Sequence, residues 1–129
     1  MTQDPKQKHQ VRFKVGRLPP SLNTMLRTHW RRRAEEQRDW DELIGCCWVG
    51  YHRFVFLHPV ELTYILSFAL NRQRDRDNYI GGTKYITDAL KRTFFFRDDA
   101  EWIRKIEVIF AAAPREGTEI IITSAGQEE

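Results

Sequence analysis

The chain has 129 residues, of which 41% are hydrophobic and 30% charged, and its formal net charge at pH 7 is +3. This length and composition are typical of one globular domain spanning residues 1–129, and they exclude both a disordered chain and a two-domain protein. No apolar run approaches the ~18 residues of a membrane span and the N-terminus lacks a secretory signal, so we expect no membrane association and a cytoplasmic location.

Six segments have the period of a strand or a helix. In chain order they are the strand Val11–Val15, the helix Thr28–Tyr51, the strand Pro59–Leu70, the helix Thr83–Arg92 and the strands Ile103–Ala112 and Thr118–Thr123. The nearly continuous apolar content of Pro59–Leu70 predicts a central strand, and a turn at residues 114–117 joins the last two strands. We therefore expect an α+β fold of β-α-β-α-β-β order, a mixed sheet packed against two helices. Residues 1–10 and 125–129 are expected to be flexible.

The longer predicted helix has an apolar stripe that should face the core, or the core plus a dimer contact, and not a ligand pocket. Its members are Trp30, Ala34, Trp40, Ile44, Cys47, Trp48 and Tyr51. A loop containing Pro19 and Pro20 precedes this helix, and its restricted backbone could form one rigid wall of a site. A plain connector would be equally compatible with the sequence.

The charge is distributed unevenly along the chain. Residues 1–33 contain nine Lys and Arg against one acidic residue, a net charge of +8, so residues 34–129 carry −5. A basic segment on a domain with an acidic cluster is compatible with binding a polyanion. A flexible basic tail beside a solvated helix face would give the same difference in net charge.

Two acidic groups are the strongest candidates for chemistry. Asp75 and Asp77 follow the central strand, and in an extended chain residues two apart point to the same side. Like charges so close are usually offset by a cation or a shared proton. The second group, Asp98 and Asp99, follows the aromatic run Phe94–Phe96. Carboxylate oxygens favour Mg²⁺ or Mn²⁺, and the chain lacks the spaced Cys or clustered His of a zinc site.

Lys84 is expected in the first turn of the helix that begins beside these carboxylates. Its ammonium there could offset charge that develops on a phosphate during transfer. Gly81 and Gly82, just before it, would let a substrate backbone approach closely. The structural alternative is that the acidic residues only form turns, while Lys84 pairs with Asp88 and Asp88 with Arg92.

Several segments, in order, resemble the RusA family of Holliday junction resolvases. They are residues 18–23 (Leu-Pro-Pro-Ser-Leu-Asn), 74–78 (Arg-Asp-Arg-Asp-Asn), 84–90 (Lys-Tyr-Ile-Thr-Asp-Ala-Leu) and 98–100 (Asp-Asp-Ala). The resemblance therefore extends from Leu18 to about Trp102. One departure is that five residues, Tyr79–Thr83, separate the Asn from the Lys, where the bacterial pattern has two. The Gly81-Gly82 pair resembles the longer turn of a phage-type branch.

The resemblance implies a small homodimeric, magnesium-dependent endonuclease that cuts four-way DNA junctions with paired nicks. Carried over by position, it implies that Asp75, Asp77 and Asp99 hold the metal and that Lys84 assists catalysis, with Asp98 less essential. The candidate DNA contacts are Arg27, Arg31, Arg32, Arg74, Arg76 and Asn78.

We therefore expect an endodeoxyribonuclease, dependent on Mg²⁺ or Mn²⁺, that resolves Holliday junctions in recombination and repair. Phe94–Phe96 could act as an aromatic wedge on opened bases, although core or dimer packing is favoured. Three alternatives stay open: a nuclease for other branched DNA, a catalytically silent DNA-binding module, and a structural domain whose acidic corner binds nothing.

Overall fold

The computed structural model describes residues 9–69, 76–95 and 100–125, with only the backbone described at 76, 77 and 100. The elements are β1 (Gln10–Val15), α1 (Leu22–Arg27), α2 (Trp30–Gly50), β2 (Val60–Ala69), η1 (Arg76–Tyr79), α3 (Thr83–Lys91), η2 (Ala100–Trp102), β3 (Ile103–Ala113) and β4 (Gly117–Ser124). This is the predicted α+β domain in the predicted order. The short helix α1 and the 3₁₀ turns η1 and η2 are additions that the sequence pattern did not indicate.

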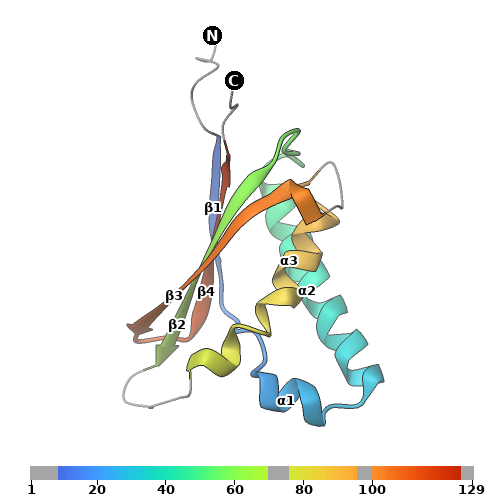
Figure 1. Cartoon of the computed structure of the whole chain (residues 1–129), viewed down its shortest axis with the longest axis vertical. Helices are drawn as coiled ribbons and strands as arrows, with labels where there is room; N and C mark the ends of the chain where they lie inside the picture. The colour runs from blue at the N-terminus through green and yellow to red at the C-terminus, as the bar shows by residue number, and fades with distance from the viewer. Residues whose placement is uncertain (1–8, 70–75, 96–99, 126–129) are drawn as a thin grey trace, which may run out of the picture.

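The four strands form one mixed sheet in the order β1-β4-β2-β3 (Figure 1). β2 is parallel to β3 and antiparallel to β4, so it is central, as predicted. β3 and β4 follow each other in the chain but do not pair, because β2 lies between them. The turn at Pro114–Glu116 therefore crosses the end of β2 and does not close a hairpin.

Helices α2 and α3 cover one face of this sheet (Figure 1). Every second residue of β2 is buried beneath them: Val60, Leu62, Tyr64, Leu66 and Phe68. The apolar stripe of α3 packs onto this face through Ile86, Ala89 and Leu90, all fully buried. Phe94 and Phe95 are also buried, which confirms core packing for these two residues, whereas Phe96 lies outside the described residues.

The apolar stripe of α2 is buried over only part of its length. Trp40 and Ile44 are fully buried, but Trp30 is 62% exposed and Ala34 is exposed as well. Trp30 and Ala34 do not reach the core of the chain, because the beginning of α2 extends past the start of α3 and away from the sheet (Figure 1), and a dimer contact for this part of the stripe stays a prediction. Within the described ranges, no helix is long and apolar enough to cross a membrane.

Candidate functional site

The predicted metal ligands fall mainly outside the part of the chain that the structure describes. Arg74, Asp75, Asp98 and Asp99 lie outside it, and Asp77 is described by its backbone alone. The expectation that the chain is extended at Asp77 is wrong, because β2 ends at Ala69 and Asp77 belongs to η1. Asp and Asn favour such turns. Among the side chains that are described, no three His, Cys, Asp or Glu residues form a group that could hold a metal ion.

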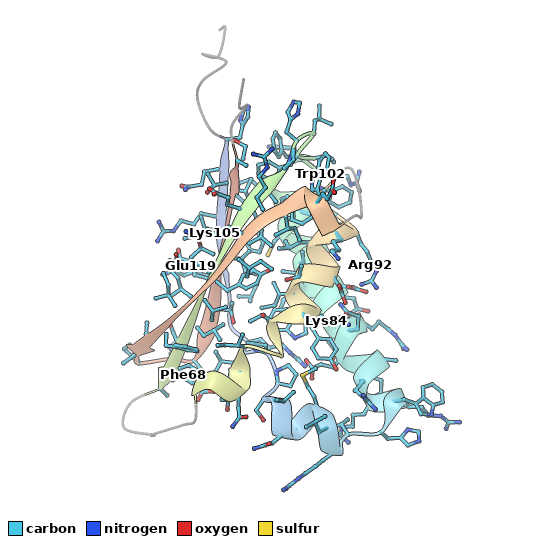
Figure 2. The ribbon with its side chains drawn as sticks, in the orientation of Figure 1. Phe68, Lys84, Arg92, Trp102, Lys105 and Glu119 are labelled. Atoms are coloured by element: carbon cyan, nitrogen blue, oxygen red, sulfur yellow. The ribbon has the colours of Figure 1, made fainter. Side chains whose placement is uncertain are left out.

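Lys84 lies where it was predicted, in the first turn of α3. Its neighbours Thr83 and Tyr85 are buried, whereas Lys84 is exposed. Figure 2 shows Lys84 on the helical side of the molecule, with Lys105 and Glu119 on the sheet. In the described ranges, no carboxylate pairs with the Lys84 ammonium.

The structural alternative for Lys84 required ion pairs within α3, and Arg92 pairs elsewhere. Its Nη1 donates to Oδ1 of Asp41 at 2.8 Å, which joins α3 to α2. The same nitrogen is 3.5 Å from the backbone oxygen of Asp88. The Asp88–Arg92 ion pair of this alternative is thus replaced, among the described residues, by one between Arg92 and Asp41.

The turn before Lys84 is held by the Pro19-Pro20 loop. A Cβ on Gly82 would overlap the carbonyl oxygen of Pro20 and would lie 3.1 Å from Cβ of Pro19. Gly81 is different, since a Cβ there would meet Cδ1 of Leu22 at an ordinary 3.4 Å. The space that Gly82 leaves is thus filled by the protein itself, not kept for a substrate backbone as predicted. The proline loop forms a wall beside the beginning of α3.

A buried hydrogen-bond chain attaches α3 to the sheet. The hydroxyl oxygens of Tyr64 on β2 and Thr87 on α3 are 2.6 Å apart, and Thr87 Oγ1 donates to the Thr83 carbonyl at 3.2 Å. Burial raises the pKa of Tyr64, so its hydroxyl stays protonated at physiological pH. Because Thr83 and Thr87 bracket Lys84, these bonds fix the backbone from which the lysine extends.

A pocket of about 150 Å³ opens between α1, α2 and the first turn of α3. Arg32 and Arg33 line it from α2, and Tyr85 lines it from the residue after Lys84. Burial and the nearby Glu36 carboxylate raise the pKa of Tyr85. The pocket therefore brings the predicted DNA contact Arg32 close to the helix turn that carries Lys84.

The remaining predicted DNA contacts lie on the helices α1 and α2 and in the turn η1. Arg27 and Arg31 are exposed on α1 and α2, and Asn78 is half-buried in η1. The side chain of Arg76 lies outside the described residues. Sequence patterns did not mark Trp30 as a site residue, because it was assigned to the stripe that faces the core, or the core plus a dimer contact. Its position between Arg27 and the run of arginines that begins at Arg31 is the signal that could have marked it as a surface residue.

Comparison with models of protein families and with curated proteins finds no match to this chain. The resemblance to resolvases therefore rests on the motifs.

Proposed function

We propose that this chain is a metal-dependent endodeoxyribonuclease of the RusA type, and that its substrate is branched DNA, the Holliday junction in particular. The observation that carries the proposal is the position of Lys84, exposed in the first turn of α3 and just past the turn that contains Asp77. An exposed cation that extends from a fixed helix turn, without a carboxylate partner among the described residues, is suited to a phosphate.

Asp75, Asp77 and Asp99 would hold the metal, and a set of carboxylate oxygens fits Mg²⁺ or Mn²⁺. When bound, the metal supplies Lewis-acid stabilisation of the phosphate and activation of a water molecule. Lys84 would place its ammonium beside the phosphate oxygens as negative charge develops on them. The wall formed by Pro19 and Pro20 supports this arrangement by limiting movement of the turn before Lys84.

Substrate affinity would come from the basic residues around this centre. Arg27, Arg31 and Arg32 are exposed on one side, and the predicted contacts Arg74, Arg76 and Asn78 belong to the segment that leads into α3. Contacts to phosphates make affinity independent of sequence and sensitive to salt. We also propose that the protein is a homodimer, because a two-fold pair offers one site to each symmetric strand of a junction. Its proposed location is the cytoplasm.

Cleavage of a synthetic four-way junction tests this function, with the parent compared to Asp77→Asn. We expect paired symmetric nicks from the parent with Mg²⁺, no nicks in EDTA, and no nicks from the variant although it still binds the junction. Asp88→Asn is a matched control because it removes a carboxylate of α3 that is not a proposed ligand, and it should cut normally. A parent that binds junctions but cuts with neither Mg²⁺ nor Mn²⁺ would favour the DNA-binding module. If the parent cuts flaps and forks as well as it cuts four-way junctions, the proposed substrate is branched DNA in general.

A further inference from the structure

Residues 22–34, which comprise α1 and the start of α2, form an arm that projects from the core (Figure 1). The arm contains Arg27, Arg31, Arg32 and Arg33 and no acidic residue. It also exposes large apolar side chains, with Leu26 72% and Trp30 62% accessible to solvent. A strongly cationic surface and a largely exposed aromatic ring therefore occur on the same projection.

Trp30 differs from the other tryptophans of the chain. Trp40 and Trp102 are buried, and the half-buried Trp48 donates from Nε1 to the Phe54 carbonyl at 2.9 Å. The ring of Trp30 has the Arg31 guanidinium 5.4 Å from its centroid and the His29 ring at 5.5 Å. Leaving so large an apolar side chain in water is unfavourable, and such exposure often marks a binding surface.

The arm is preformed, because each of its helices begins at a capping side chain. Ser21 Oγ accepts a hydrogen bond from the Thr24 amide at 3.2 Å, and His29 Nδ1 accepts one from the Arg31 amide at 3.2 Å. The base of the arm also adjoins the turn before Lys84, since Leu22 lies against Gly81. A ligand on Trp30 would meet a helix backbone that is already ordered, which lowers the entropic cost of binding.

The chemistry of the arm distinguishes among possible occupants. A second copy of the arm is disfavoured, because four arginines without an acidic residue would face four more. A membrane surface is disfavoured because α1 has only six residues and offers no extended apolar face. Single-stranded nucleic acid fits both features, since its bases stack on aromatic rings and its phosphates bind guanidinium groups.

We infer that Trp30 stacks on an unpaired base of bound DNA while Arg27 and Arg31 bind adjacent phosphates. This inference deepens the proposed function and rests on it, because it names the part of a branched substrate that the arm binds. Strand branch points and opened crossovers expose such bases, whereas intact duplex does not.

The test measures binding of labelled DNA in EDTA, so that cleavage plays no part. A fork with single-stranded ends is compared with a blunt duplex of equal length, using the parent, Trp30→Ala, Trp30→Phe and Leu26→Ala. Stacking on one base is worth about 1–3 kcal/mol, so we expect Trp30→Ala to weaken fork binding roughly tenfold and duplex binding by less than about twofold. Trp30→Phe should keep most of the affinity. Leu26→Ala is the matched control on the same arm and should bind like the parent.

Tryptophan emission provides a second measurement on the same samples. Fork DNA should quench the emission of the parent, and this quenching should disappear in Trp30→Phe. Three results would overturn the inference. They are no loss of affinity in Trp30→Ala, equal losses on fork and duplex, and an equal loss of fork affinity in Leu26→Ala, which would show that apolar surface in general, and not stacking by the ring, is needed. Since no cleavage is measured, failure of the stacking role can be told apart from failure of the Asp77→Asn experiment.

Discussion

The carbonyl oxygen of Pro20 occupies the space that a Cβ on Gly82 would need. The two residues come from motifs about sixty positions apart in the chain, one before α1 and one before α3. Their contact makes the proline loop and the turn before Lys84 a single packed unit. The glycine is required there because the backbone of Pro20 is not free to move like the end of a long side chain.

Gly82→Ala should therefore destabilise the protein. Forcing a methyl group into a packed site typically costs about 1–3 kcal/mol in the free energy of unfolding, which urea denaturation would measure. Gly81→Ala is the matched control, because its Cβ would make only an ordinary contact with Leu22. It should be neutral or slightly stabilising, by at most about 1 kcal/mol. Equal losses in the two variants would show that the turn, and not the contact with Pro20, requires glycine.

The bond between Tyr64 and Thr87 predicts an asymmetry between its two partners. Tyr64→Phe leaves Thr87 Oγ1 donating to the Thr83 carbonyl, so the loss should be about 1 kcal/mol. Thr87→Val leaves the buried Tyr64 hydroxyl without its partner and should cost more, up to about 3 kcal/mol. Thermal or urea unfolding of both variants would measure the difference. A larger loss in Tyr64→Phe would contradict it.

Local patterns predicted the elements well, and contacts between distant segments account for what they missed. The apolar run of β2 and the helical period of α3 arise from neighbouring residues, so both elements were predicted within a residue or two. Periodicity also indicated one face of α2. It could not show that the rest of the domain covers this face at Trp40 and Ile44 but does not reach Trp30. The glycine pair was recognised as a close approach, yet the approaching group is Pro20, which sequence spacing does not reveal.

The same limit applies to the sheet and to the candidate site. A turn after β3 was predicted, but the insertion of β2 between β3 and β4 depends on pairing across the whole domain. Lys84 was placed correctly because the start of a helix has local signals. The extended chain expected at Asp77 was wrong, because turn-forming residues around Asn78 outweighed the continuation of the strand.

Glu119 on β4 should make stability depend on pH in the acidic range. The hydrogen bond from Arg12 on β1 lowers the pKa of Glu119. Because the folded pKa lies below the unfolded one, the stabilisation is present above the unfolded value, near 4.5, and is lost as pH falls through the folded pKa. Glu119→Gln should thus be less stable than the parent at neutral pH, by a small amount because Arg12 is exposed. Unfolding temperatures should converge in acid, and a pH-independent difference would contradict this origin.

Lys84→Ala should separate catalysis from binding. Removing one preorganised donor to a developing negative charge typically lowers kcat about 10²- to 10³-fold, and we expect that loss in junction cleavage with Mg²⁺ while affinity changes little. Lys105→Ala is the matched control, since it removes an equally charged, exposed ammonium from β3, where Lys105 lies 3.7 Å from Glu107. Single-turnover cleavage rates and binding constants for both variants would measure the two effects. If Lys84→Ala cuts at the parental rate, or if both variants lose cleavage equally, Lys84 only adds to general electrostatic attraction and has no specific place at the scissile phosphate.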